Sequence, residues 1–249
     1  SELNDPTNIP GLNFFTAESL PDVIQAIATT EDLVWLIGTN SSEPFYNSDD
    51  ADNPFQRVPS GVSHIGTDWP DSVLRLDNSI WMVGRDKEGA GIVWRSQGNQ
   101  FTRVSTSAVE RFTSKATNLT AHSYQEEGHS FYVVNADQGT WAFDIKTSEW
   151  AERAWLNRDT GFQERARPET HAYAFGMHIV TDYANSNIYR QSLDIQADDG
   201  QEIRRTRVSS HVETDGAPLI IDEIFLDFAT GVGLDGVGQG TNPEVMLRV

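Results

Sequence analysis

The sequence predicts an all-β fold, a β-propeller built of four-stranded antiparallel blades, with about four blades visible in a partial chain. Three observations support this prediction. Hydrophobic landmarks return along the chain at a spacing of 46 residues. Each repeating unit contains four short runs rich in aromatic and β-branched residues, separated by turn residues. No long segment with a helical period of 3.6 residues competes with these runs.

Two landmarks define the repeat. The run FQRV at residues 55–58 returns as FTRV at residues 101–104, and VWLIG at residues 34–38 returns as IWMVG at residues 80–84. Weaker copies of the second landmark follow further along the chain, namely FYVV at residues 131–134 and HIV at residues 178–180. A β-sandwich would explain the strands but not the returning landmarks, so the pattern favours a repeat architecture.

The second unit shows the expected blade most clearly. Its four β-rich runs are residues 72–76, 80–84, 91–94 and 101–104. The turns between them are rich in Asp, Asn and Gly, which suits the tight hairpins that join antiparallel strands. Four antiparallel strands repeated at this spacing are typical of a propeller blade.

The repeat sets the expected domain limits. We expect propeller blades within residues 1–212, at about residues 22–58, 71–104, 120–155 and 170–208. The fourth blade would close with residues 203–208 as its last strand, and a short helix over residues 109–115 would join the second and third blades. Residues 213–249 would start a further β element, because LIIDEIFLDF at residues 219–228 has a strand-like composition. Since four blades do not comfortably close a propeller, we expect the chain to be truncated.

The composition excludes several classes of function. The chain has no cysteine, which excludes disulfides, zinc–thiolate sites and cysteine nucleophiles. It has no apolar run of 18 residues, so we expect no membrane-spanning helix. The formal net charge of -19, from 37 acidic and 18 basic residues, opposes nucleic-acid binding, which depends on Lys and Arg contacts to phosphate. The charge suits either general solubility or a surface along which DNA passes without adhering.

An acidic stretch, FYNSDDADNPFQRV at residues 45–58, raises the question of a cation site. An EF-hand loop needs carboxylates at positions 1, 3 and 5, glycine at 6 and glutamate at 12. Counting from Asp50, Asp52 fits position 3, but Pro54 and Gly61 occupy positions 5 and 12. Counting from Asp49, position 3 is alanine. We therefore interpret the stretch as a polar hairpin loop, with a cation site as the alternative.

Two further patterns concern turns between strands. The run NADQGTW at residues 135–141 is similar to the Asp-box turn of sialidase-type propellers, and we expect a turn whose Trp141 packs between blades. His171 and His178 are expected to face each other across a tight turn at Phe175 and Gly176. Two histidines without a third ligand make a weak metal site, so we favour cross-strand packing for this pair.

No motif for catalysis is present, and we predict no catalytic, cofactor-binding or metal-binding residues. The sequence lacks GxSxG and HExxH, and the glycine-rich run at residues 231–240 lacks the Lys-Ser/Thr pair of a phosphate-binding loop. The 37 acidic residues leave a paired-carboxylate glycosidase open. Arg204, Arg205 and Arg207 would guard an edge strand against pairing, or would contact an acidic neighbouring subunit.

Several short sequence motifs are uninformative one by one but together are similar to a known family. They run in order along nearly the whole chain: TAESLPD at 16–22, LIGT at 36–39 followed by Glu43, YNSDDADNPFQRV at 46–58, VGRD at 83–86 with GAGIV at 89–93, EGHSFYV at 127–133, WAER at 150–153, HAYAFG at 171–176 and GQEIRRTR at 200–207. Together they resemble the packaged-DNA stabilisation protein of short-tailed bacteriophages, the tail hub or plug. Members of that family are longer than this chain.

The resemblance implies a structural virion protein of the phage tail, made in the host cytoplasm, with no enzymatic activity and no cofactor. Several copies, six in the simplest case, would form a hub ring below the portal and adaptor proteins. The ring would hold tail fibres, spikes or a needle, close the DNA channel and retain the packaged DNA. DNA would pass through the channel without specific binding, which an acidic chain favours.

Two alternatives stay open at this point. A glycan-binding or glycan-hydrolysing β-propeller would need exposed Trp or Tyr over a polar groove, with two carboxylates close together. A general protein-interaction propeller would need neither feature. Portal and adaptor genes beside the gene for this chain would favour the tail hub.

Overall fold

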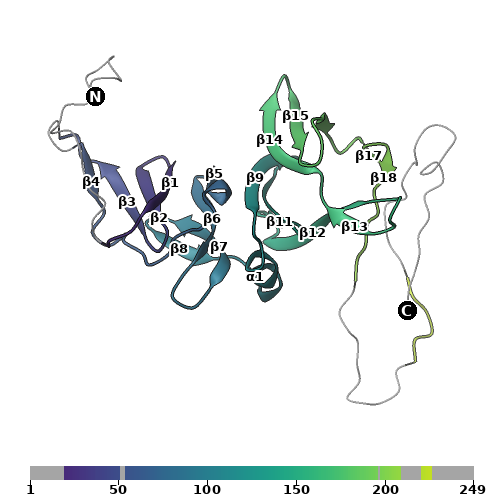
Figure 1. Cartoon of the computed structure of the whole chain (residues 1–249), viewed down its shortest axis with the longest axis horizontal. Coiled ribbons are helices and arrows are strands. Elements are labelled where there is room, and N and C mark those ends of the chain that lie inside the picture. The colour runs from purple at the N-terminus through teal and green to yellow at the C-terminus, as the bar shows by residue number, and fades with distance from the viewer. Residues whose placement is uncertain (1–19, 51–53, 196, 209–219, 226–249) are drawn as a thin grey trace. The chain divides into compact units, whose positions relative to one another are not determined.

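Antiparallel sheets of two to five strands follow one another along the chain (Figure 1). The computed structural model describes residues 20–50, 54–195, 197–208 and 220–225. The chain divides into two units, which we describe separately. The first comprises Ser1–Ala154 and Glu164–Gln191, and the second comprises Trp155–Gln163 and Ser192–Val249. The blades described below lie in the first unit, apart from strand residues 155–156 and Gln163, which belong to the second. The sheet arrangement confirms the predicted β-propeller fold.

Each sheet is built from strands that are consecutive in the sequence. The first blade contains β1 (Ile24–Thr29), β2 (Leu33–Gly38), β3 (Ser42–Asn47) and β4 (Phe55–Arg57). The second contains the 3-10 helix η1 (Pro70–Ser72), β5 (Leu74–Leu76), β6 (Ser79–Arg85), β7 (Ala90–Gln97) and β8 (Gln100–Arg103). The third contains β9 (Leu119–Glu126), β10 (His129–Ala136), β11 (Gly139–Asp144) and β12 (Glu149–Leu156), with β13 (Gln163–Arg165) at its edge. The fourth contains β14 (Pro168–Ala174), β15 (Met177–Asp182) and β16 (Ile188–Gln191). The limits of the domain and its blades that were inferred from the sequence stay predictions.

Tight turns with two left-handed residues join the first and second strands of three blades. Asp77 and Asn78 have φ of 52° and 49° in the second blade. Glu127 and Gly128 occupy the corresponding turn of the third blade, with φ of 49° and 75°. Turns of this kind match the right-handed twist of the flanking strands, so they hold each pair of strands in register. The Asp, Asn and Gly residues noted in the sequence therefore play the expected role.

The central strand β6 is buried on both faces, which explains its apolar sequence. Ile80 and Met82 belong to a buried cluster with Trp35 of β2, between the first and second blades. Trp81 belongs to a second cluster with Tyr132 of β10, between the second and third blades. Successive residues of a strand point to opposite faces, so alternate positions serve the two neighbours. Each buried aliphatic side chain of this size stabilises the fold by roughly 1.5–3 kcal/mol.

The first strands of the blades lie next to one another. Contacts join β1 to β5, β5 to β9 and β9 to β14. The fourth strands β4, β8 and β12 lie on the far side of the third strands in their sheets. The first strands therefore form the inner side of the blades, as in a propeller.

A short helix and a hydrogen bond strengthen the contact between the second and third blades. Helix α1 spans Ser107–Thr113, two residues earlier than the expected 109–115, and buries Val109 in the cluster around Trp81. The Tyr132 hydroxyl donates to the carbonyl oxygen of Ser72 at 2.9 Å. Within the described residues, no helix combines the length and apolar character needed to cross a membrane.

The fourth blade differs from the expectation at its outer edge. Residues 203–208 form no strand, and the sheet contains three strands. Three arginines among six residues leave only Ile203 and Val208 as apolar side chains, and these are 44% and 87% exposed. Such a run has no apolar face to bury, so it lacks the packing that stabilises a strand.

The second unit contains a short hairpin of β17 (Ala197–Asp198) and β18 (Gln201–Glu202), joined by a turn at Asp199 and Gly200. Most of the further β element expected over residues 213–249 lies outside the described residues. Residues 220–225 are described and form no strand.

Candidate functional site

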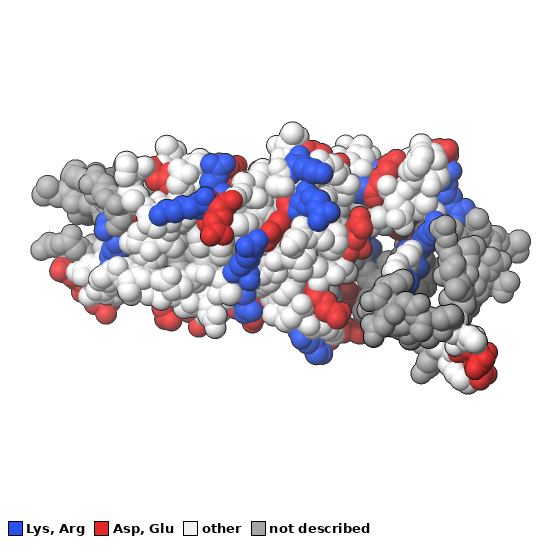
Figure 2. Space-filling model, turned by 90° about the horizontal axis from the view of Figure 1, so that it is seen from below, with Lys and Arg blue, Asp and Glu red and all other residues white. Residues whose placement is uncertain are grey.

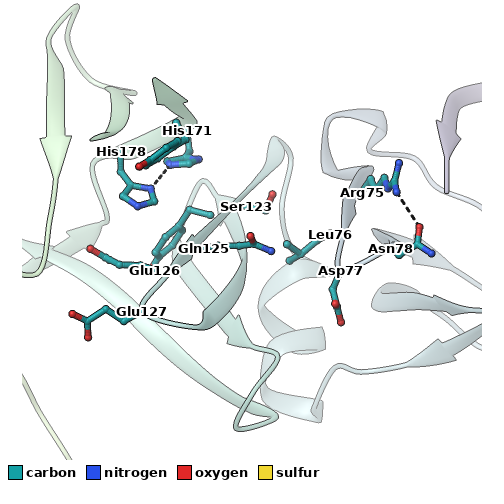
Figure 3. Close-up of a pocket in the computed structure, with 12 residues that line it drawn as sticks. Arg75, Leu76, Asp77, Asn78, Ser123, Gln125, Glu126, Glu127, His171 and His178 are labelled. Atoms are coloured by element: carbon teal, nitrogen blue, oxygen red, sulfur yellow. Dashed lines mark hydrogen bonds between the residues drawn. The ribbon is translucent and has the colours of Figure 1, made fainter. Parts of the chain in front are cut away.

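A groove of about 670 Å³ lies where the second, third and fourth blades meet, within the first unit (Figure 3). Strand β5 supplies Arg75, the β5–β6 turn supplies Asp77, and the end of β9 supplies Tyr124. Strands β14 and β15 supply His171 and His178. The volume lies within the range of ligand-binding clefts, and charged groups and rings line the same space.

The two histidines face each other as the sequence predicted. The turn at Phe175 and Gly176 has φ of 54° and 73°, which brings β14 and β15 back as a tight hairpin. The Nε2 atom of His171 lies 2.9 Å from Nδ1 of His178. Among the residues that the structure describes, no three His, Cys, Asp or Glu side chains are grouped so that they could hold a metal ion. The pair is therefore a hydrogen-bonded element of the groove wall.

The hydrogen bonds determine which nitrogen of each ring carries the proton. His171 also bonds to the backbone of Ser123 in a way that favours its charged form, so its N–H donates to the Ser123 carbonyl oxygen. Since Nε2 of His171 faces His178, the donating atom is Nδ1. Burial lowers the pKa of His171, the neighbouring His178 lowers it further, and the bond to Ser123 opposes both effects. In neutral His171, Nε2 is then an acceptor, and His178 donates to it from Nδ1.

A further histidine, His122 of β9, is almost fully buried. His122 is 7% exposed, and its Nδ1 lies 3.3 Å from the side-chain nitrogen of Asn135. Asn135 also donates to the carbonyl oxygen of Pro168 at 3.1 Å and accepts from the Thr140 hydroxyl at 2.8 Å. Burial, with the positive charge of Arg153 as the next cause, lowers the pKa of His122 to about 3. His122 is therefore neutral at physiological pH.

Two aromatic rings and one arginine of the third blade pack together beside the groove, and one of the rings, Tyr124, lines it. Tyr124 stacks on Phe131 with ring centroids 4.7 Å apart, and the Arg153 guanidinium lies 5.2 Å from each ring centroid. Arg153 also donates to the Tyr124 hydroxyl at 2.5 Å. Burial raises the pKa of Tyr124, while Arg153 opposes that effect. An arginine over an aromatic face is a favourable arrangement, so Arg153 stabilises the stacked pair of rings.

Ion pairs complete the junction of the third and fourth blades. Arg165 pairs with Glu169, which also accepts a hydrogen bond from Thr120 at 2.8 Å. Arg167 pairs with the buried Asp182 at 3.5 Å. The fourth blade is thus attached largely through polar and ionisable groups, whereas aromatic and aliphatic side chains join the first three blades.

The acidic stretch that suggested a cation site behaves as a polar turn where it is described. The Asp49 amide donates to Asn47 Oδ1 at 3.1 Å, and the Asp50 amide donates to Ser48 Oγ at 3.4 Å. Asp49 has φ of 58°, which is typical of a turn. Asp52 lies outside the described residues.

The Asp-box-like run forms a turn that fastens the start of β9. Asp137 accepts hydrogen bonds from the amide and hydroxyl of Thr117, at 2.9 and 2.5 Å, and from the Asn118 amide at 3.1 Å. These bonds, led by that of the Thr117 side chain, lower the pKa of Asp137. Trp141 packs against Phe112 of α1, with ring centroids 6.4 Å apart. The expected packing between blades is therefore present.

An aspartate of the first blade has a similar role, which the sequence did not predict. Asp22 accepts hydrogen bonds from the Asn40 amide at 2.6 Å and from the Ser41 amide and hydroxyl at 2.8 and 2.9 Å. It ties the residues before β1 to the β2–β3 turn. An aspartate immediately before a first strand was the available signal, but its partners lie 18 residues or more away.

Carboxylates neutralise the arginines of the first two blades. Ion pairs join Arg57 to Glu43, Arg75 to Glu31, Arg85 to Asp68, Arg95 to Asp77 and Arg103 to Glu110. Figure 2 shows blue and red side chains interspersed on one face of the molecule. The described blades therefore present paired charges there, which is unlike the basic stripe of a nucleic-acid-binding protein.

The arginines of residues 203–208 do not have the role first considered. Arg204, Arg205 and Arg207 are exposed and lie in a segment without strand structure, so they do not guard the edge of a sheet. Their contact with an acidic neighbouring subunit stays a prediction.

Comparison with known protein families gives a match over most of the chain. A family model described as bacteriophage P22 Gp10, beta-propeller, matches residues 1–196 of the 249-residue chain. No curated protein matches the chain.

Proposed function

Because the chain belongs to the family described as bacteriophage P22 Gp10, beta-propeller, we propose that it forms a hub ring in a phage tail, below the portal and adaptor proteins. Membership of this family identifies the chain as a phage structural β-propeller protein that serves to stabilise packaged DNA. The ring closes the DNA channel, retains the packaged genome and anchors tail fibres or spikes. The protein has a structural role and resides in the virion, after synthesis in the host cytoplasm.

The observation that carries this proposal is the pairing of arginines with carboxylates in a strongly acidic chain. The net charge is -19, and arginines such as Arg57 and Arg103 are held by carboxylates. DNA affinity grows with the number of phosphates that free Lys and Arg neutralise. A channel wall of this kind retains DNA by mechanical closure and releases it without a strong hold on the phosphates.

Ring formation requires a heterologous interface, in which one surface of each copy contacts a different surface of the next. Exposed apolar side chains on the fourth blade suit such a role. Phe175 at the β14–β15 turn is 90% exposed, Tyr173 is 66% exposed and Ile188 is 69% exposed. Six copies form the ring in this proposal, with the portal, adaptor and fibre or spike proteins as further partners.

Glycan binding is the alternative that the sequence left open. Its expected feature is an exposed Trp or Tyr beside two close carboxylates. All seven tryptophans are buried or half-buried, whereas Tyr173 lines the groove together with Glu126 and Glu127. Screening the protein against a glycan array tests this alternative directly.

Genome retention tests the proposal. DNA-filled phage capsids that lack this protein are incubated with and without the purified full-length protein, and DNase-sensitive DNA is then measured. We expect the protein to convert leaking capsids into capsids that protect their DNA. Equal DNA loss with and without the protein would contradict the proposed retention.

A further inference from the structure

The hydrogen-bonded histidine pair presents a defined acceptor in the groove. The Nδ1–H group of His171 donates to the Ser123 carbonyl oxygen, and the Nδ1–H group of His178 donates to Nε2 of His171. In this arrangement, Nε2 of His178 carries a lone pair, because a neutral imidazole has one donor and one acceptor nitrogen. His178 lines the groove, and its Nδ1 is the atom that bonds to His171. The groove therefore contains an acceptor whose direction is fixed by a half-buried partner.

Charges on the groove wall favour a cation. Glu126 and Glu127 lie on the same side as the two histidines in Figure 3, and Asp77 lies opposite them. Arg75 is the basic residue among those that line the groove, and it is held by Asn78 at 3.0 Å and by Glu31. Three carboxylates and one guanidinium line the groove. Asp77 is paired with Arg95 at 3.0 Å, just as Arg75 is paired with Glu31, so these two ion pairs offset each other and the wall keeps an excess of negative charge. A ligand with several N–H donors and a positive charge complements both the carboxylates and the histidine acceptor.

We propose that this groove binds the guanidinium group of an arginine carried by an extended segment of a partner protein, with Nε2 of His178 accepting one of its N–H groups. A guanidinium has five donors in a rigid plane and no acceptor, which suits a wall that offers carboxylate and imidazole acceptors. The flat group also stacks on aromatic rings, and Tyr124 and Tyr173 both line the groove. Arg153 already lies over Tyr124 from within the chain.

The proposal concerns recognition by a single chain and does not depend on ring formation. The groove volume of about 670 Å³ exceeds the space that one side chain needs, so residues flanking the arginine enter as well. Ser123, Gln125 and Asn78 line the same groove and offer hydrogen-bonding groups for the backbone of such a segment. A free polyamine shares the positive charge but lacks the planar group and the flanking backbone.

The first test is the protonation pattern of the two rings in the unaltered full chain. Long-range ¹H–¹⁵N correlation spectra distinguish the Nδ1–H from the Nε2–H tautomer of a neutral histidine. We expect both His171 and His178 to be Nδ1–H tautomers at neutral pH. An Nε2–H tautomer of His178 would overturn the proposal, because the groove would then present a donor.

The second test is binding of a defined peptide. Acetyl-Gly-Arg-Gly-amide is titrated while the Nε2 resonance of His178 is followed, with the neutral citrulline peptide and spermidine as parallel ligands. We expect the arginine peptide to shift this resonance and the citrulline peptide to bind at least about tenfold more weakly. Equal binding of the citrulline peptide would overturn the role of charge. Saturation by spermidine without any effect of the arginine peptide would overturn the assignment to a protein side chain.

A matched pair of variants locates the contact. His178→Phe keeps a ring of similar size but removes the acceptor, and His64→Phe makes the same change at an exposed histidine outside the groove. We expect His178→Phe to weaken binding of the arginine peptide at least about tenfold, and His64→Phe to leave the affinity for the peptide unchanged. Equal affinity of both variants would show that His178 is not the acceptor. The tautomer spectrum of the unaltered chain decides the question if His178→Phe does not fold.

Discussion

Acidification is expected to destabilise the fold through His122, and a single substitution isolates this effect. The His122 side chain is buried between the third and fourth blades, which lowers its pKa from 6.5 to about 3. The unfolded chain binds a proton at this residue below pH 6.5, whereas the folded chain excludes it down to about pH 3. Stability from this group is therefore complete above pH 6.5 and is lost progressively as the pH falls toward 3.

The size of the effect follows from the two pKa values. Each pH unit within this window costs about 1.4 kcal/mol for one group, so the loss between pH 7 and pH 5 is about 2 kcal/mol. Over the whole window the same relation gives an upper bound of about 5 kcal/mol. His122→Gln removes the titrating group and keeps a side chain that can bond with Asn135.

Urea unfolding followed by tryptophan fluorescence measures this difference at pH 7 and pH 5. We expect the unaltered protein to lose about 2 kcal/mol more than His122→Gln between the two pH values. His64→Gln changes an exposed histidine and should follow the unaltered protein. Parallel pH dependence of the unaltered protein and His122→Gln would refute the reasoning, since His122 would then titrate equally in both states.

Three further outcomes are expected. Trp81→Ala removes a fully buried ring between the second and third blades and should lower the free energy of unfolding by about 3–5 kcal/mol, as measured by urea denaturation. Asp137→Ala should speed hydrogen exchange of the amides of residues 117–118, whereas Asp137→Asn, which keeps an acceptor oxygen, should change it less. Glu43→Met leaves the half-exposed Arg57 without its buried partner and should cost about 1–3 kcal/mol in the same denaturation assay. The double change with Arg57→Met should recover part of that loss, and an equal or larger loss would contradict a role for the ion pair.

The blades could be predicted from the sequence because their determinants are local and repeated. The runs at residues 34–38 and 80–84 form β2 and β6, and the alternation of side chains in β6 reflects burial against two neighbouring blades. The contact between His171 and His178 could also be predicted from local features, because a tight turn at residues 175–176 leaves few possible registers for the two strands.

The groove and its polar supports depend on contacts between blades and could not be predicted in the same way. Asn135 bonds to Pro168, 33 residues away, and Asp22 bonds to Asn40, 18 residues away. Such contacts follow from how the blades stack, and no periodic pattern in the sequence encodes them. The available signal was Asn135 itself, because an amide within the apolar run FYVVNA must find hydrogen-bond partners when it is buried.

The mass of the full-length protein in solution, alone and mixed with the portal–adaptor complex of its phage, tests the proposed tail hub most directly. We expect a closed ring, or stable addition of several copies to that complex, in either case without added DNA. A monomer that stays separate from the portal–adaptor complex and instead binds a glycan array would contradict the proposed hub and favour a glycan-binding propeller.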